Sequence, residues 1–463
     1  MKDLTQGSIG SHLVQMAAVM LIGMVGQTLY YIVDLYFVAG LGPQAIAGVG
    51  AAGNIAFVVL ALTQILNVGT VALISHAAGR KDQADANLVF NQSLALSALI
   101  GVFVLVAGYL LTGPYLRTVG ADEGMQQAGI TYLYWFLPGL ALQFAMVSMG
   151  AALRGTGIVR PTMTVQVLSV LLNVVLAPVL IAGWGTGHPL GAAGAGLAST
   201  IAIAAGVVLL TLYFTRLEKY VGFHSEQWQP NLAYWKRILN IGLPAGGEFF
   251  VMFLIMAITY WVIRQFGSEA QAGYGIGQRV MQAIFLPAMA VAFSAAPIAG
   301  QNFGARRADR VRETFRSAAL METGVMVVIT LLCQLAPGMF IRVFTNDPAV
   351  IEVGTDFLRI ISWNFLVTGI IFTCSSMFQA MGNTWPALLS GISRLVLYGV
   401  PAVWLSLQPN FHLHHVWEVS VAATAVQAVI SYLLLQVELR KKLAFAAPAP
   451  VATQSPAPPP ATS

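Results

Sequence analysis

One carboxylate stands alone in a long apolar stretch near the start of the chain. Asp34 lies within segment 27–50, QTLYYIVDLYFVAGLGPQAIAGVG, in a run of about twenty apolar residues that is long enough to cross a bilayer as a helix. An ionised side chain at that depth costs at least about 2.5–3.5 kcal/mol, so it must be paired, hydrated or neutralised by a proton. Two interpretations follow: a structural aspartate bonded to polar groups of neighbouring helices, or a coupling-cation site of a transporter. We adopt the second as the working hypothesis.

Further ionisable residues interrupt apolar segments in the second half of the chain. Glu248 follows Pro244 by four residues, so a bend is expected just before it. Arg279, Arg359 and Arg394 also lie within apolar segments. One interpretation is an ion pair between Glu248 and Arg279 or Arg394 that locks this half of the molecule. The other is a polar cavity that contacts substrate, for which we expect this lining: Glu248, Arg279, Arg394, Gln278, Gln282 and Tyr274.

The elements that must position these residues are transmembrane helices. The chain is 57% hydrophobic and only 9% charged, with a mean hydropathy of +0.75, whereas soluble domains carry about 25% charged residues. We therefore expect an all-α integral membrane protein whose first apolar segment is a retained span and not a signal peptide. Apolar runs between hydrophilic breaks predict twelve spans: 13–39, 45–75, 88–112, 125–152, 163–183, 192–216, 237–264, 272–299, 313–337, 351–378, 387–405 and 416–438.

Lysine and arginine are distributed unevenly over the breaks between these spans. Most of them fall on one side of the stack, and only Arg117, Arg264 and Arg342 fall near the other. By the positive-inside rule, this asymmetry predicts that both termini are cytoplasmic. The net charge of +5 is accordingly interpreted as topology and not as nucleic-acid binding. We expect a multi-pass protein of the cell inner membrane, surrounded by lipid.

The sequence repeats itself at a shift of 225 residues. LGPQAIAGVG at 41–50 aligns with FGSEAQAGYG at 266–275, and Gly79 aligns with Gly304. At the same shift, Gly157 and Pro161 align with Gly382 and Pro386. Because each half has six spans, an even number, the two halves share one orientation and form a parallel repeat. We therefore expect two six-helix bundles around a central cavity.

The repeat and the composition divide the chain into four parts. Residues 1–216 form the expected N-terminal six-helix lobe, and residues 237–440 form the C-terminal one. A polar cytoplasmic linker, 217–236, joins them. The remainder, 441–463, is rich in Pro and Ala, cannot bury a core and is expected to be disordered.

Other motifs are interpreted without invoking chemistry. GVGAAG at 48–53 matches a dinucleotide-binding pattern, but it lies inside a span, where small residues let helices pack closely. No phosphate loop, HExxH motif or nucleophile elbow occurs, so we expect neither an enzyme nor a resident cofactor. His412, His414 and His415 precede the last span and are interpreted as solvated, with no metal. The sequon at Asn91 begins a span on the cytoplasmic side and is not expected to be glycosylated.

As an ensemble, these residues resemble the multidrug and toxic compound extrusion (MATE) family of secondary transporters. The resemblance rests on Asp34 followed by GLGPQAIAGVG, on LRGTG with Pro161, on the Asn173 span followed by GAAGAGLAST, on LPAGGEFF, and on PIAGQNFGARR at 297–307. It covers about residues 9 to 440. It implies two six-helix lobes and the export of small amphipathic, often cationic, drug-like compounds in exchange for protons or sodium. We also expect a monomer.

The resemblance also implies a cation site in the first lobe. Asp34 matches the family's principal carboxylate, and Tyr30 and Asn173 match polar neighbours of that site. Many members carry a second carboxylate four residues after the asparagine, where this chain has Ala177. Sodium therefore loses a hard oxygen ligand, so we expect protons as the coupling ion, with sodium as the alternative. A proline that bends the first helix in related proteins is Val19 here.

Two other functions were weighed against drug export. A lipid-linked sugar flippase of the same superfamily fold would favour a basic cavity, which the arginines of the second half could supply, but it is expected to have fourteen spans. A membrane-embedded enzyme would need clustered acid–base groups or metal ligands near one membrane face, and the sequence has no such cluster.

Overall fold

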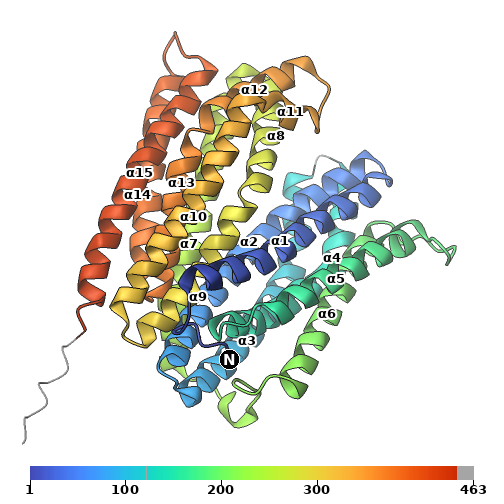
Figure 1. Ribbon diagram of the computed structural model, residues 1–463. Helices are drawn as coiled ribbons and strands as arrows, with labels where there is room; N and C mark the ends of the chain where they lie inside the picture. Colours follow the sequence, from blue (N-terminus) through green and yellow to red (C-terminus); the bar gives the residue numbers. More distant parts are fainter. Residues whose placement is uncertain (121, 446–463) are drawn as a thin grey trace, which may run out of the picture.

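The computed structural model describes residues 1–120 and 122–445, and these are almost entirely helical (Figure 1). Most of the predicted tail, from residue 446 onward, lies outside the described residues. The first half of the chain forms six helices: α1 (Ile9–Ala39), α2 (Pro43–Gly79), α3 (Gln83–Val119), α4 (Glu123–Gly155), α5 (Arg160–Ala182) and α6 (Ala192–Arg216).

The second half has the same number of crossings, but two of them are broken. Its helices are α7 (Leu232–Ile263), α8 (Ser268–Ile284), α9 (Leu286–Gly304), α10 (Ala308–Leu335), α11 (Pro337–Arg342), α12 (Pro348–Ile361), α13 (Asn364–Ala380), α14 (Trp385–Ser406) and α15 (Leu413–Lys442). Ten helices in the described part are long and apolar enough to cross a membrane. Two further pairs, α8 with α9 and α12 with α13, are bent by 47° and 59°. Counting each pair as one span gives the twelve that hydropathy predicts.

Helix boundaries coincide with residues that satisfy the free backbone groups of a first turn. Asp82 begins α3 by accepting a hydrogen bond from the backbone N–H of Asp85, and Asp122 does the same for Met125 in α4. Asn231 caps α7 in this way. A side-chain acceptor at this position stabilises a helix by about 1 kcal/mol. These three helices therefore begin at polar residues of the breaks between apolar runs.

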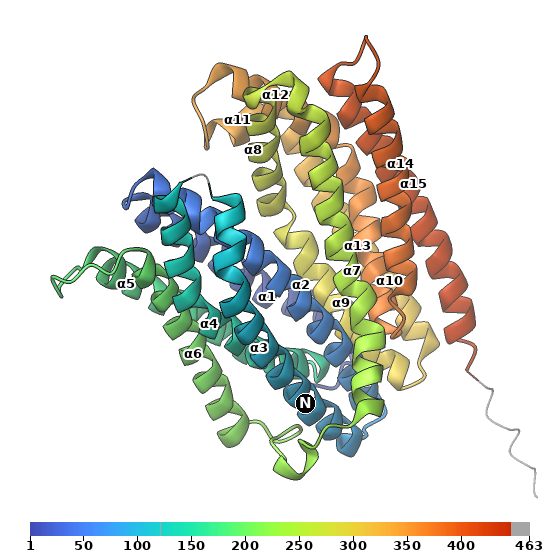
Figure 2. The same ribbon diagram turned by 180° about the vertical axis from the view of Figure 1, so that it is seen from behind.

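The helices form two lobes that diverge towards one end of the molecule, as both views show (Figures 1 and 2). Helices α1 to α6 form the N-lobe, and α7 to α15 form the C-lobe. Close packing within the N-lobe uses the GVGAAG segment as predicted, because a Cβ at Gly48 would lie only 2.5 Å from the Met125 carbonyl oxygen of α4. We call the end where the lobes meet, and where the N-terminus lies, the closed end; the opposite end is the open end.

At the closed end, the two lobes touch through residues related by the 225-residue repeat. The His76 Nε2 atom lies 2.6 Å from the carbonyl oxygen of Ala380, and the Gln301 Nε2 atom donates to the carbonyl of Gly155 at 3.0 Å. Residues 76 and 301 differ by 225, as do residues 155 and 380. The glycines follow the same rule: a Cβ at Gly79 would collide with the Gln301 carbonyl, and one at Gly304 with the His76 carbonyl. The parallel internal repeat is therefore confirmed in three dimensions.

The burial of α2 changes along its length in step with this arrangement. From Pro43 to Leu62 its buried residues, Ala45, Gly48, Ala52 and Val59, are spaced as on one helix face. From Thr63 to Gly79 most residues are buried on every face. The second part is enclosed because α7 and α9 of the C-lobe cover it, whereas the first part contacts its own lobe only on one side.

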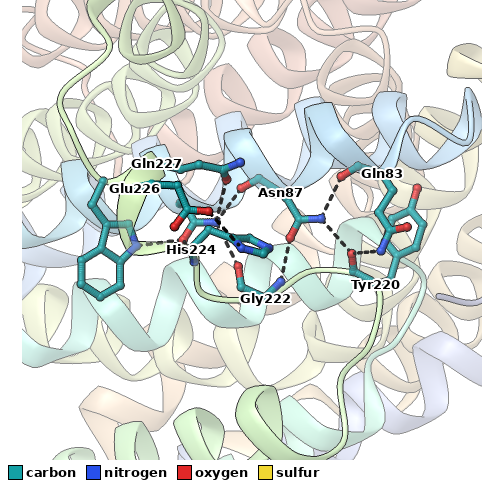
Figure 3. A network of polar contacts seen from close by, with 9 residues as sticks. Gln83, Asn87, Tyr220, Gly222, His224, Glu226 and Gln227 are labelled. Atoms are coloured by element: carbon teal, nitrogen blue, oxygen red, sulfur yellow. Dashed lines mark hydrogen bonds and ion pairs between the residues drawn. The ribbon is translucent and has the colours of Figure 1, made fainter.

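The segment after α6 is fastened to the N-lobe by a row of amide side chains on α3 (Figure 3). Asn87 donates to the carbonyl of Tyr220 at 3.0 Å and accepts from the N–H of Gly222 at 2.8 Å. One turn later, Asn91 accepts from the N–H of His224 at 3.0 Å and donates to the carbonyl of Gly222 at 2.9 Å. Asn91 is fully buried in this network, which agrees with the expectation that its sequon is not modified.

Helix α7 begins at Leu232, inside the predicted linker range, and belongs to both lobes in turn. Ile238 and Ala245 lie in the hydrophobic cluster of the N-lobe. Val262 and Ile263 lie in a cluster with residues of α8, α12 and α15. The helix is continuous through Pro244, which lies within the part that packs on the N-lobe, since Ala245 still belongs to that cluster.

Candidate functional site

Asp34 lies in α1 among apolar side chains and has little access to solvent. Its side chain is only 8% exposed, and its Oδ1 atom is buried without a hydrogen-bond partner among the described residues. Among those residues, the ion pairs found within 4.0 Å do not involve it. A carboxylate with so little compensation is costly when ionised, so the site favours a neutral acid or a bound cation.

Asn173 of α5 is the natural neighbour of Asp34 by helix register. Helices α1 and α5 pack in parallel, and Gln166 donates to Gln27 at 2.7 Å. Two helical turns later on each helix, seven residues in both cases, come Asn173 and Asp34. Asn173 is fully buried, and neither its Oδ1 nor its Nδ2 atom has a hydrogen-bond partner among the described residues. Two incompletely satisfied polar side chains therefore lie at one level of two adjacent helices.

Tyr30 extends this polar level to a third helix. It precedes Asp34 by one turn of α1, and its hydroxyl forms a short hydrogen bond with the Ser199 hydroxyl of α6. The structure thus places all three residues predicted for the cation site, Asp34, Tyr30 and Asn173, on helices that pack against one another. In the described part of the chain, the group offers one carboxylate oxygen of Asp34 and the amide of Asn173 without hydrogen-bond partners.

The equivalent position in the C-lobe has a different chemistry. At the 225-residue shift, Asp34 corresponds to Thr259 and Asn173 corresponds to Tyr398. The Thr259 and Tyr398 hydroxyls are 2.6 Å apart and hydrogen-bonded, and both side chains are buried. The C-lobe pair is neutral and satisfied, whereas the N-lobe pair carries an acid and has unused bonding capacity.

Glu248 does not form the predicted ion pair. Its carboxylate accepts from the Ser375 hydroxyl of α13, at 3.2 Å and 3.5 Å for its two oxygens. In the described part of the chain, no arginine nitrogen lies within 4.0 Å of it. The ion-pair interpretation with Arg279 or Arg394 is therefore wrong, because α7 directs Glu248 towards α13.

Three of the predicted cavity residues lie close together in the C-lobe. Gln278 donates to the Tyr274 hydroxyl at 2.8 Å, and Arg394 interacts electrostatically with Tyr274 and Tyr398. The Tyr274 ring is only 3% exposed and stacks on Trp417 at 5.5 Å between ring centroids. Tyr274 is thus enclosed in an aromatic cluster, and the buried Arg394 Nε atom has no hydrogen-bond partner among the described residues.

The other two predicted cavity residues lie apart from this group. Arg279 and Gln282 are exposed side chains on α8. Within a membrane-spanning segment, a charged side chain avoids lipid and faces protein or a water-filled space. Arg279 therefore belongs to a wetter surface than the enclosed Arg394.

Sequence reasoning missed one intramembrane acid. Glu322 lies in the middle of α10, is fully buried, and has two carboxyl oxygens without a hydrogen-bond partner in the described structure. The signal that could have found it was available, since a single carboxylate in an apolar run is the same pattern that identifies Asp34.

Two of the three histidines before the last predicted span, His414 and His415, lie close to one another and to Glu418. His414, His415 and Glu418 each offer one ligand atom, and these atoms lie within 4.8 Å of one another. The His415 Nδ1 atom already accepts a hydrogen bond from the backbone N–H of His412. This cluster lies in the first turns of α15, where Trp417 stands next to Glu418.

Comparison with known proteins places this geometry in a family. A sequence profile described as MatE matches residues 20–179 and 244–405, once in each lobe and in agreement with the 225-residue repeat. The "Probable multidrug resistance protein YoeA" of Bacillus subtilis (strain 168) is 25% identical over 417 residues, covering 87% of this chain and 88% of the relative. The "Multidrug export protein MepA" of Staphylococcus aureus (strain bovine RF122 / ET3-1) is 26% identical over 408 residues, covering 84% and 88%.

Solved structures agree on the fold. One described as "Outward-facing conformation of a multidrug resistance MATE family transporter of the MOP superfamily" superposes with a TM-score of 0.89 at 24% identity, covering 95% of this chain and 98% of the other. The profile match extends over more than half of the chain, and the fold, the repeat and the span count agree with it. The chain is thus a multi-pass membrane protein that belongs to the MatE family of transporters.

Proposed function

We propose that this chain is a secondary multidrug exporter in which a proton bound at Asp34 drives the outward movement of amphipathic, often cationic compounds. The observation that carries the proposal is the buried acid of α1, whose Oδ1 atom has no hydrogen-bond partner among the described residues, at the level of Asn173 of α5, whose Oδ1 and Nδ2 atoms also have none there. The names of the relatives, which describe multidrug export and resistance, support the substrate class.

The preference for a proton over sodium rests on the number of oxygen ligands. A hard cation favours a shell of several oxygens. The α1–α5 level offers one carboxylate and one amide, and the next turn of α5 carries Ala177, which is fully buried and adds no ligand. A proton needs only the carboxylate. No cofactor beyond the coupling cation is required.

We further propose an orientation with both termini in the cytoplasm of a bacterial cell and the protein in its cell membrane. Basic residues between spans support this orientation, because they gather at the closed end, among them Arg80, Arg306 and Arg307. With the closed end in the cytoplasm, the described conformation is open to the outside. The bacterial origin of the relatives supports the location.

Coupling requires that the proton and the drug prefer different states of the transporter, because a ligand with equal affinity for both states shifts nothing. Neutralising Asp34 removes the cost of a buried charge and lets α1 pack more closely on α5 and α6. That change would release the drug on the outside and precede closure of the open end. The half-buried Glu248 and the exposed Arg279 would lie along the surface that the drug meets, and the enclosed Tyr274 and Arg394 would support it.

The test is the uptake of ethidium, a fluorescent cationic dye, into inverted membrane vesicles, with pH and sodium gradients imposed separately. We expect a pH gradient to drive uptake and a sodium gradient to have little effect. Asp34→Asn removes the titratable group and keeps the shape, so gradient-driven uptake should fall at least about tenfold at equal expression.

Glu269→Gln is the matched control, since this acid is exposed at the start of α8 and its loss should leave uptake unchanged. If Asp34→Asn takes up ethidium at the wild-type rate, the assignment of Asp34 as the coupling site is refuted. Uptake driven only by sodium would refute the choice of proton while keeping the site.

A lipid-linked sugar flippase is not favoured. The relatives are named for multidrug export, and twelve spans agree with that function. Because the internal repeat supplies both lobes within one chain, we also propose that the monomer is the working unit.

A further inference from the structure

The C-lobe encloses a second acid that the mechanism above does not use. Glu322 lies near the middle of α10 and is 0% exposed, so it is more deeply buried than Asp34 at 8%. In the described structure, neither carboxyl oxygen has a hydrogen-bond partner, and no basic side chain lies within 4.0 Å. An ionised carboxylate without a donor in such a place is strongly disfavoured, so the geometry suits a protonated acid.

The surroundings of Glu322 are contributed by α13. Gly369 allows the two helices to approach closely, because a Cβ there would lie 3.5 Å from both the Cβ and the Oε2 atoms of Glu322. Thr373 is the polar side chain in front of the carboxyl group. Its hydroxyl donates to the carbonyl of Gly369 at 2.9 Å, so its oxygen remains as an acceptor only. An acceptor at this position favours a protonated carboxyl group, which can donate, over a carboxylate, which cannot.

Few other titratable groups face this acid. Cys374 of α13 interacts with it, and α9 carries no titratable side chain. The α1 helix meets α10 through an apolar cluster that includes Met20 and Ala318. The Tyr432 ring of α15 lies against Phe315 of α10, with ring centroids 6.4 Å apart, two turns before Glu322. The α11 and α12 helices meet the far end of α10, where Gln334 donates to the backbone of Arg359.

We propose that Glu322, enclosed by Thr373 and Cys374 between α10 and α13, is a second proton-binding site of the chain, separate from Asp34 and used in the transport cycle. Loss of the proton leaves a charge that needs water, and water can enter only if α10 and α13 separate. Helix α13 ends at Ala380, whose carbonyl contacts His76 of the N-lobe at the closed end. A movement of α13 therefore reaches the contact that holds the lobes together.

The first test does not depend on transport. Infrared difference spectra between acidic and alkaline pH are recorded on the purified full-length chain in lipid nanodiscs. We expect the wild type to show the C=O band of a protonated carboxylic acid that survives at neutral pH, and Glu322→Gln to lose that band. Glu313→Gln, an exposed acid of the same helix, should keep it. An undiminished band in Glu322→Gln overturns the proposal.

A second variant covers the case in which Glu322→Gln does not fold. Thr373→Val keeps the shape of the threonine and removes the acceptor in front of the carboxyl group. The C=O band should then shift to higher frequency, because the Thr373 oxygen that can accept from the acid O–H has been removed. An unshifted band contradicts the assigned site.

The third test addresses use in the cycle, and this part rests on the proposed function. Proton release on ethidium binding is measured with a pH indicator in weakly buffered detergent solution. Glu322→Gln and Asp34→Asn should each lose part of the wild-type release, and the double variant should lose both parts.

If Glu322→Gln releases as many protons as the wild type, the proposal is overturned, because Glu322 is then a permanently protonated structural residue. If the wild type itself releases no protons, then proton coupling fails and the use of Glu322 in the cycle fails with it. The infrared band would still decide whether the acid holds a proton.

Discussion

The two lobes of this transporter are alike where they touch and different where they hold acids. At the closed end, His76 and Gln301 stand at equivalent positions of the repeat and bind equivalent backbone carbonyls, those of Ala380 and Gly155. Farther along α1, Asp34 corresponds to Thr259 of α7, a neutral residue hydrogen-bonded to its own neighbour. The comparison teaches that the duplicated scaffold provides a symmetric contact between the lobes, whereas the ionisable side chains differ from one lobe to the other.

The acids of the C-lobe support this conclusion. Glu248 corresponds to Gly23, and Glu322 corresponds to Ser97, so neither has an acidic counterpart in the N-lobe. The symmetric contacts join backbone carbonyls to the neutral side chains of His76 and Gln301 and to the glycines Gly79 and Gly304. The acids depend on single side chains and can differ between lobes without disturbing the close approach of the helices.

The largest expected effect separates the two equivalent positions Asp34 and Thr259. Asp34→Asn should reduce proton-driven ethidium uptake at least about tenfold, while Thr259→Val should keep uptake within about twofold. Thr259→Val instead breaks the hydrogen bond to Tyr398 and should cost about 1 kcal/mol in the free energy of unfolding. Vesicle uptake and thermal unfolding in detergent measure both changes. Equal losses of uptake in the two variants would contradict the claim that only the N-lobe position is needed for proton-driven uptake.

An intermediate effect is expected at the paired glycines of the closed end. Gly79→Ala and Gly304→Ala each place a methyl group against a carbonyl of the other lobe, and each should destabilise the protein by about 1–3 kcal/mol and slow transport. Gly53→Ala is the control, because a Cβ there meets no atom within 4 Å and lies in the same helix as Gly79. Thermal unfolding of all three variants is compared. Clearly unequal effects of the Gly79 and Gly304 substitutions would show that the contact is not symmetric in solution.

The smallest effect is expected when His76 of the N-lobe is replaced by glutamine, the residue at the equivalent position 301 of the C-lobe. His76→Gln can keep a donor towards the Ala380 carbonyl, as Gln301 does towards Gly155, so we expect a change of less than about 1 kcal/mol in the free energy of unfolding. His76→Ala removes the donor and should cost more, about 0.5–1.5 kcal/mol for the bond plus its ring contact with Phe303. A His76→Gln variant as unstable as His76→Ala would contradict the equivalence of the two side chains.

Much of the architecture was predictable from the sequence, because spans and repeats are regular patterns. The 225-residue shift found with Gly79 and Gly304 recurs as a contact between the lobes. The bends between α8 and α9 and between α12 and α13 were not predictable, because hydropathy counts apolar length and not helix direction. The neighbours of Glu248 were also wrongly expected, because its partner Ser375 depends on the rotation of α7 about its axis.

The candidate site was predictable only in part, for a similar reason. Sequence reasoning singled out Asp34 by its isolation among apolar residues and added Tyr30 and Asn173 by resemblance. It did not reveal that the amide of Asn173 has no hydrogen-bond partner among the residues that the structure describes, since that depends on what α1 and α6 present to it. It also gave no sign that Tyr274 is enclosed by Trp417, because these residues are distant in the sequence.

The row of amide side chains on α3 limits which segment between the lobes can bend. A flexible segment between the lobes would absorb a relative movement of the lobes. Here Asn87 and Asn91 bind the backbone of the segment after α6 and hold it to the N-lobe. The first turns of α7 are likewise anchored there, through Ile238. This anchored part extends past Pro244, because Ala245 lies in the N-lobe cluster and a Cβ at Gly246 would meet Ile65 of α2. A bend of α7 between the lobes would therefore lie after Gly246 and before Ile255, which packs with the C-lobe cluster. A relative movement of the lobes would therefore have to bend α7 itself, because the segment before it is held to the N-lobe.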